Sequence, residues 1–299
     1  MKNNLSQNIT GGLWMIASAF SFSLANLFVK KLGFRLPAIE IAFVRCFVQF
    51  LLLWPLIMRA GGVKFLATTK IKYYFMRLLF GISNMIVFYF VIVKIPMANA
   101  VSISYARPLF MVILAYLMLN ETCGFHRILA TIFGFAGVVV LIRPDVNGFN
   151  SASFWAVSAS LFLAVTHIYI KRLSQTESPL AMVTWFSIAS TITCLPFSIF
   201  VWVMPTLYET LVMVFIAILS VLGQYTTIKA FYHGDATIVS SLDYSQIVFA
   251  SAFGILFLNE FPNLYTYIGS AMIIGSSIYI LYREKKVKPQ NTSTIKVAA

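Results

Sequence analysis

Ten apolar runs joined by short polar loops dominate the sequence. Each run approaches or exceeds the roughly 20 residues that a helix needs to cross the hydrocarbon core of a bilayer. The runs cover residues 11–32, 37–58, 73–94, 97–119, 126–142, 152–172, 180–204, 208–231, 236–258 and 263–282. Lipid offers no partner to an open strand edge, and the ten-residue alternating segments of a membrane barrel are absent. The sequence therefore predicts an all-α integral membrane protein with ten transmembrane helices.

The overall composition agrees with a membrane protein. Of the 299 residues, 60% are apolar and 10% are charged, whereas a soluble domain has about 45–50% apolar and about 25% charged residues. The mean hydropathy is +0.87. The first apolar run is too long for the core of a signal peptide and has no convincing cleavage site, so we expect it to remain as a helix.

The distribution of Lys and Arg predicts the orientation. In the loops and at the ends of the runs, fourteen of these residues fall on the side of the N-terminus and five on the opposite side. The positive-inside rule therefore places both termini in the cytoplasm, with residues 283–299 as a cytoplasmic tail at the cell inner membrane. The net charge of +13 is spread over short loops and does not form one patch. We therefore expect no nucleic-acid partner.

An internal repeat relates the two halves of the chain. Asn120-Glu121 and Asn259-Glu260 both follow an apolar run, and aligning them matches seven of 21 positions. The matches include Ser102 with Ser241, Tyr105 with Tyr244, Phe110 with Phe249, Leu117 with Leu256 and Leu119 with Leu258. A nearly equal offset pairs Trp14 with Trp155, Lys30-Lys31 with Lys171-Arg172, and Pro55 with Pro196. The unit holds five helices, an odd number, so the second copy enters the membrane inverted. This predicts two inverted repeats, 11–142 and 152–282, with a substrate site where they meet.

These features together resemble the drug/metabolite transporter superfamily, EamA group. The fourth helix of each half ends in Asn-Glu and is followed by a Gly-rich fifth helix, GFAGVVVLI at 134–142 and IGSSIYIL at 274–281. Arg45, early in the second helix, matches a tendency of the same family. The resemblance covers about residues 11–282. It implies a substrate cavity between helices 1, 3, 4, 6, 8 and 9, and transport by alternating access.

Within that family, some details are similar to the branch of S-adenosylmethionine uptake transporters. The similar features are Glu40 five residues before Arg45, Arg77 in YFMRLLFG and the ending FLNEFP at 257–262. These residues do not themselves name a substrate.

Two ionisable residues inside the runs are the strongest site candidates. A charged side chain at the centre of a membrane helix costs about 2.5–3.5 kcal/mol on insertion scales, so such residues usually face the interior of the bundle. Arg107 and Asp243 lie in symmetry-related helices. They can form a structural salt bridge. Alternatively, they can bind a zwitterion, the guanidinium taking its carboxylate and the carboxylate taking an ammonium or sulfonium.

Other polar residues have a ligand interpretation and a packing interpretation. Tyr105 and Tyr244 can stack on a ring or hold a cation, or simply pack between helices. Ser102 and Ser241 can donate hydrogen bonds or allow close helix approach. Asn26 and His167 occupy matching positions in helices 1 and 6. His167 can carry a proton during transport or act as a hydrogen-bonding packing residue.

A third group of residues is expected to be structural or gating. We expect Arg45 to pair between helices or to gate, with substrate binding as the alternative. Arg77 is expected to extend toward the headgroups. Glu121 and Glu260 end helices, where a negative charge needs a nearby cation, the N-terminus of the next helix, or both. We expect them to cap helix 5 and helix 10, and a gating role stays open. Three glycines, Gly134, Gly137 and Gly275, are expected to pack helices closely.

The sequence favours a transporter over an enzyme. The three cysteines, Cys46, Cys123 and Cys194, and the three histidines are dispersed, and a Walker loop is absent. We expect no metal and no cofactor. The partners are a small-molecule substrate and the lipid bilayer. The predicted function is secondary transport of a small organic metabolite, with S-adenosylmethionine uptake or exchange as one form and amino-acid or amine/drug export as another. A membrane-embedded enzyme on a lipid-linked substrate, using Asp243 as acid or base, is the alternative class.

Overall fold

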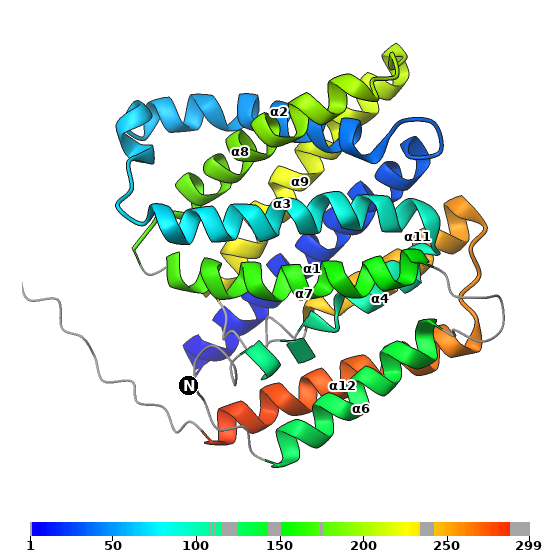
Figure 1. Cartoon of the computed structure of the whole chain (residues 1–299). Helices are drawn as coiled ribbons and strands as arrows, with labels where there is room; N and C mark the ends of the chain where they lie inside the picture. The colour runs from blue at the N-terminus through cyan, green and yellow to red at the C-terminus, as the bar shows by residue number, and fades with distance from the viewer. Residues whose placement is uncertain are drawn as a thin grey trace, which may run out of the picture.

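The computed structural model describes residues 2–107, 109–110, 112–114, 125–142, 151–173, 176–233 and 242–287, and the regular secondary structure of these residues is entirely helical (Figure 1). The helices are α1 (Lys2–Leu32), α2 (Ala38–Arg59), the 3-10 helix η1 (Gly62–Leu66), α3 (Ile71–Lys94), α4 (Met97–Ser104), α6 (Phe125–Ile142), α7 (Ser151–Leu173), α8 (Pro179–Phe200), α9 (Leu207–His233), α11 (Ser245–Leu258) and α12 (Leu264–Val287). Two of the candidate site residues, Glu121 and Ser241, lie outside the described residues, as do residues 288–299 of the predicted tail.

Length and composition qualify most of these helices as membrane-spanning. Among the described residues, six helices contain apolar stretches long enough to cross a bilayer: Ile9–Leu32, Ala38–Arg59, Ile71–Lys94, Ala152–Ile170, Leu180–Phe200 and Leu207–Thr227. Three shorter apolar stretches are Ile128–Ile142, Ser245–Leu258 and Leu264–Ile280. On α8, Ile192, Phe197, Ile199 and Phe200 are each more than half exposed. An apolar surface of this kind suits contact with lipid.

Two of the predicted helices are interrupted, and the prediction of continuous helices over 97–119 and 236–258 is wrong in this respect. The helix α4 ends at Ser104, and α11 begins at Ser245 after a turn at Tyr244. At the first break, the Tyr105 and Ala106 N–H groups donate to carbonyls three residues back, at 3.1 and 2.9 Å. Both bonds span three residues in place of four, and helical residues follow the break at Arg107, 109–110 and 112–114.

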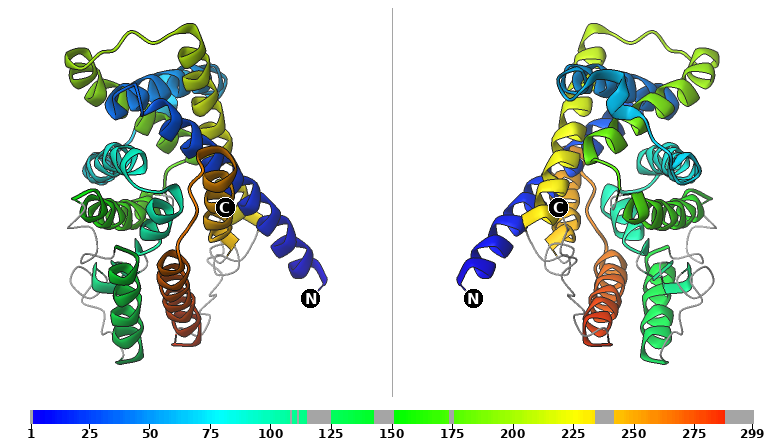
Figure 2. Two further views of the ribbon diagram at one scale, coloured as in Figure 1. Left: turned by 90° about the vertical axis from the view of Figure 1, so that its right-hand side faces the viewer. Right: turned by 90° about the vertical axis from the view of Figure 1, so that its left-hand side faces the viewer.

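The helices pack in pairs that join the two halves of the chain. The pairs are α1 with α9, α3 with α7, α2 with α8, α6 with α12, and α4 with α11. Figures 1 and 2 show α3 beside α7 and, at the far end of the molecule, α6 beside α12. Each pair takes one helix from before residue 143 and one from after residue 150.

Glycines allow the close approach of α6 and α12. A Cβ atom on Gly269 would lie 2.7 Å from the Gly137 carbonyl oxygen, and one on Gly134 would lie 2.5 Å from the Ser276 hydroxyl. The prediction of close packing therefore applies to Gly134 and Gly137. It is wrong for Gly275, where an added Cβ would meet nothing within 4 Å.

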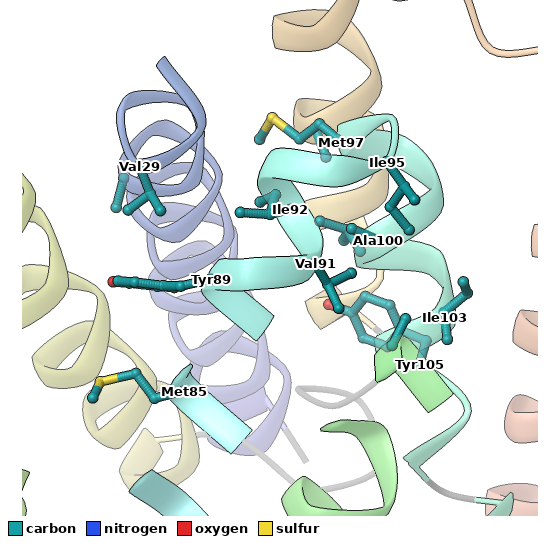
Figure 3. Close-up of a cluster of buried hydrophobic side chains, with 14 of the residues drawn as sticks. Val29, Met85, Tyr89, Val91, Ile92, Ile95, Met97, Ala100, Ile103 and Tyr105 are labelled. Atoms are coloured by element: carbon teal, nitrogen blue, oxygen red, sulfur yellow. The ribbon is translucent and has the colours of Figure 1, made fainter. Parts of the chain in front are cut away.

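A buried apolar cluster lies where α3 gives way to α4 and holds the start of α4 in place. Figure 3 shows Ile92, Ile95 and Ala100 gathered at this turn, with Tyr105 at the other end of α4. Ile92 and Ala100 are fully buried, and Ile95 is 4% exposed. The cluster therefore fixes both ends of the short helix that leads into the first break.

Candidate functional site

The two interrupted helices meet through a hydrogen bond from a side chain to the main chain. The Tyr105 hydroxyl donates to the Asp243 carbonyl oxygen at 2.6 Å and also lies 3.2 Å from the Gln246 Oε1 atom. In a regular helix the Ile247 N–H would donate to that carbonyl, but here it donates to the Tyr244 carbonyl at 3.0 Å. Tyr105 thus supplies the donor that the second break removes.

Arg107 and Asp243 lie side by side at the same place. The Arg107 Nη2 atom is 3.4 Å from the Asp243 Oδ2 atom, and the two side chains are 22% and 24% exposed. A well-formed charge-assisted bond is about 2.7–2.9 Å long, so this pair is in contact without being tightly closed. The Arg107 guanidinium also lies 5.8 Å from the centre of the Tyr105 ring. The site therefore contains one cation and one anion, both partly accessible.

The two repeat-related tyrosines pack on each other. The ring centres of Tyr105 and Tyr244 are 4.8 Å apart with an interplanar angle of 47°. Both residues are buried, at 4% and 8% exposure. Such contacts between aromatic rings stabilise the junction of the two helices.

His167 lies beside Arg107, whereas in the part of the chain that the structure describes Asn26 makes no hydrogen bond to Tyr105, Arg107 or Asp243. The His167 Nδ1 atom lies 2.8 Å from the Leu163 carbonyl oxygen, and its Nε2 atom lies 3.5 Å from Arg107 Nη1. A carbonyl can only accept, so Nδ1 carries the hydrogen, and in a neutral ring Nε2 is free to accept from Arg107. Asn26 on α1 is 8% exposed. Among the described residues, Arg107, Tyr105 and Asp243 form no hydrogen bond with it.

Ser102 lies against α12 and not against Arg107. The Ser102 and Ser270 hydroxyls are 2.8 Å apart and buried. This contact matches the interpretation of Ser102 as a small packing residue that lets two helices approach. Its repeat partner, Ser241, is one of the predicted residues outside the described part of the chain.

Gln246 is a site residue that the sequence interpretation missed. Besides the contact of its side chain with Tyr105, its carbonyl oxygen accepts a hydrogen bond from the Ser23 hydroxyl of α1 at 3.1 Å. The repeat contains the missing signal, because the offset that pairs Tyr105 with Tyr244 also pairs Arg107 with Gln246. Extending the alignment to positions that differ would have identified it.

The second Asn-Glu motif closes α11. Asn259 adopts the left-handed conformation, with φ of 54° and ψ of 31°. The Glu260 N–H then donates to the Gly254 carbonyl, six residues back, at 2.9 Å. This geometry ends many helices, and Asn tolerates it better than most side chains do. The Asn of the motif therefore makes the turn, which leaves the Glu side chain to act elsewhere.

The Glu260 carboxylate binds both a cation and a helix N-terminus. Lys30, which is 3% exposed, forms an ion pair with Glu260, and the Met97 N–H donates to the Glu260 Oε2 atom at 2.8 Å. The helix that receives the cap is α4. The expected capping of helix 10 is wrong, because the Thr266 N–H at the start of α12 donates to Asn263 Oδ1 at 2.9 Å instead. Glu121, the first member of the pair, lies outside the described residues.

Two other arginines are buried between helices. Arg45 donates to the Tyr89 hydroxyl at 2.8 Å and so links α2 to α3. Arg77 is 7% exposed and donates to the Met182 carbonyl at 2.6 Å. The expectation that Arg77 extends toward the headgroups is wrong, because α8 offers its guanidinium a carbonyl acceptor inside the protein.

Comparison with known proteins shows the family to which the chain belongs. The profile of the EamA-like transporter family matches the chain twice, over residues 9–143 and 150–282. The chain belongs to the EamA-like transporter family. One solved crystal structure superposes on this EamA-like transporter with a TM-score of 0.65 at 17% sequence identity, covering 94% of this chain and 100% of that chain. That likeness supports the fold.

Three curated relatives are transporters of small molecules. The S-adenosylmethionine uptake transporter of Rickettsia prowazekii is 30% identical, covering 96% of this chain and 97% of its own. The pseudopaline exporter CntI of Pseudomonas aeruginosa is 30% identical, with 93% and 97% covered. The riboflavin transporter of Vibrio cholerae is 25% identical, with 93% and 95% covered. The protein is therefore a multi-pass inner-membrane transporter of a small molecule and not an enzyme.

Proposed function

We propose that this EamA-like transporter is a secondary transporter that carries a small zwitterionic or cationic metabolite by alternating access. The observation that carries the proposal is the Arg107–Asp243 contact of 3.4 Å between two helices that are interrupted at repeat-related tyrosines. Interrupted helices at corresponding positions of two repeats are a general mark of a transporter substrate site. Arg107 and Asp243 then bind the substrate in addition to joining the two halves of the chain.

The proposed architecture is ten transmembrane helices in two inverted five-helix repeats, 11–142 and 152–282, followed by a tail at 283–299. The packing supports this symmetry. Exchanging α1 with α7 and α3 with α9 converts the α1–α9 contact into the α7–α3 contact, and the other three main pairs map onto themselves. Each of those pairs, α2–α8, α4–α11 and α6–α12, joins equivalent helices of the two halves. The excess of Lys and Arg on the side of the N-terminus supports cytoplasmic termini.

The chemistry of the site fits a ligand that carries both charges. The Arg107 guanidinium can hold a carboxylate through two parallel hydrogen bonds, and Asp243 can hold an ammonium or sulfonium. A ligand inserted between them replaces the single 3.4 Å contact with two closer ones. The faces of Tyr105 and Tyr244 can hold a ring or a cation. His167 orients Arg107, and we propose that Asn26 lines the path to the site.

The substrate that we propose is S-adenosylmethionine, taken up or exchanged. It carries a carboxylate, an ammonium, a sulfonium and an aromatic base, which match the guanidinium, the carboxylate and the tyrosine rings. The relative of Rickettsia prowazekii supports this choice. The pseudopaline exporter has the same 30% identity and supports export as the second candidate, with an amino acid or amine as a cargo that fits the two charges of the site.

Uptake of labelled S-adenosylmethionine into cells that express the chain tests the proposal. Unlabelled S-adenosylmethionine, its demethylated product and a mixture of amino acids serve as competitors. Saturable uptake that the first two block and the amino acids do not is the expected result. Absence of uptake, with the protein shown to be in the membrane, would exclude this substrate for import. Efflux of amino acids or amines from preloaded cells would then test the second candidate.

A further inference from the structure

We infer that Glu260 is a positioning residue that couples the closure of one mouth of the transporter to the geometry of the substrate site. This inference rests on the proposed function. Its basis is the Glu260 carboxylate, which binds the Lys30 ammonium of α1 and the N-terminus of α4 at once. The helix α4 leads directly from that contact to Tyr105 and Arg107.

The junction around Glu260 joins four helices. Lys30 comes from the last turn of α1 and Glu260 follows α11. Lys30 also donates to the Ile95 carbonyl, at the end of α3, at 2.6 Å. Met97 begins α4. A single ion pair therefore ties together the ends of α1, α3 and α11 and the start of α4.

The ion pairs of the described residues all join the first half of the chain to the second: Lys30–Glu260, Arg35–Glu209 and Arg107–Asp243. They differ in burial. In the first pair the side chains of Lys30 and Glu260 are 3% and 22% exposed, whereas in the second those of Arg35 and Glu209 are 48% and 11% exposed, so the main difference is the burial of the cation. A buried pair is screened little by solvent, and removing one partner leaves an uncompensated charge. An exposed pair contributes little. The Lys30–Glu260 pair is thus the stronger connection at this mouth.

The length of α4 makes the coupling direct. From Met97 to Ser104 the helix has only eight residues, about two turns, and Tyr105 follows at once. A movement of the start of α4 therefore carries the Tyr105 hydroxyl and the Arg107 guanidinium with it. Alternating access requires this mouth to open at some stage. Opening separates Lys30 from Glu260. The Glu260 carboxylate, which caps α4 at the Met97 N–H, then shifts the start of α4, and Tyr105 and Arg107 move with it.

Cysteine accessibility tests the closing part of the inference without any substrate. The reporter is Asn26→Cys, in a chain whose Cys46, Cys123 and Cys194 are replaced by alanine. Asn26 lies four residues before Lys30 on α1, and so on the same helix face one turn deeper. The rate of labelling by a membrane-impermeant maleimide is measured in intact cells and in inside-out vesicles, so that each side of the membrane is sampled.

We expect Lys30→Met and Glu260→Gln each to raise the labelling rate about tenfold from one side, within the usual range of coupling between sites. The double variant should match either single variant, because one interaction is removed in each case. It also leaves no unpaired charge, so it serves as the variant least prone to misfold. Arg35→Gln, at the exposed pair, is the matched control and should change the rate less than about twofold. Unchanged rates in both single variants, or additive effects in the double variant, would overturn the inference.

Transport kinetics test the positioning part. Glu260→Gln keeps an amide oxygen that accepts from the Met97 N–H, whereas Glu260→Ala removes the acceptor. We expect the KM for S-adenosylmethionine to be several-fold higher in Glu260→Ala than in Glu260→Gln. Equal KM values would overturn the positioning role. If the unmodified chain transports no S-adenosylmethionine, the proposed function fails for that substrate, and the labelling experiment still decides whether the Lys30–Glu260 pair holds this mouth closed.

Discussion

Replacing Tyr105 by phenylalanine removes one hydroxyl and keeps the ring. That hydroxyl donates to the Asp243 carbonyl at 2.6 Å, and the Ile247 N–H, which would otherwise serve this carbonyl, is bonded to Tyr244. The variant Tyr105→Phe therefore leaves a partly buried acceptor without its donor at the break before α11.

The expected loss of stability follows from this geometry. An unsatisfied buried acceptor costs about 1–3 kcal/mol. Hydrogen bonds between helices of a membrane protein average about 0.6 kcal/mol and reach about 1.7 kcal/mol. The Asp243 carbonyl has no partner within its own helix. We therefore expect Tyr105→Phe to cost about 1–2 kcal/mol, near the upper end of the values for hydrogen bonds between membrane helices. With a shift of about 2–4 °C per kcal/mol, the thermal midpoint falls by roughly 2–8 °C.

The assay is the midpoint of heat-induced loss of monodisperse protein in detergent. Tyr208→Phe is the control, since Tyr208 is 69% exposed and should tolerate loss of its hydroxyl within about 0.5 kcal/mol. Equal midpoints for the two variants would refute the reasoning, because they would mean that the Asp243 carbonyl does not depend on Tyr105.

Two further variants test local geometry by the same assay. Asn259 has φ of 54°, so Asn259→Val should destabilise by about 1–2 kcal/mol while Asn259→Gly is nearly neutral; equal midpoints would contradict the backbone argument. Gly269→Ala places a Cβ 2.7 Å from a backbone oxygen and should cost about 1–3 kcal/mol. Gly275→Ala, with nothing within 4 Å, should be tolerated, and a loss as large as that of Gly269→Ala would show that close packing of α6 on α12 is not the cause.

Because the helices lie in lipid, much of this fold can be predicted from the sequence. A backbone in hydrocarbon must satisfy its own hydrogen bonds, so an apolar run of sufficient length becomes a helix. The run 126–142 accordingly appears as Phe125–Ile142, and the run 37–58 as Ala38–Arg59. The contact of Arg107 with Asp243 was expected on the same grounds, because lone charges in apolar helices turn inward and pair.

Features that depend on contacts distant in sequence were not predictable. The break at Tyr244 is satisfied by a hydroxyl from residue 105, and Glu260 caps a helix that begins 163 residues earlier. Arg77 was assigned to the headgroups because its depth in the helix permits that. Its actual direction depends on a carbonyl of α8. Sequence patterns define which residues are polar and buried, but the choice among available partners is made by tertiary packing.

Uptake of labelled S-adenosylmethionine by Asp243→Asn, at a matched membrane level, is the most direct test of a substrate site at Arg107 and Asp243. Glu209→Gln, which changes a carboxylate of the pair with the half-exposed Arg35, is the control. We expect Asp243→Asn to lose saturable uptake, because the carboxylate that holds the cationic group is gone, while Glu209→Gln keeps it. Uptake by Asp243→Asn equal to that of the unmodified chain would contradict a substrate site at Arg107 and Asp243.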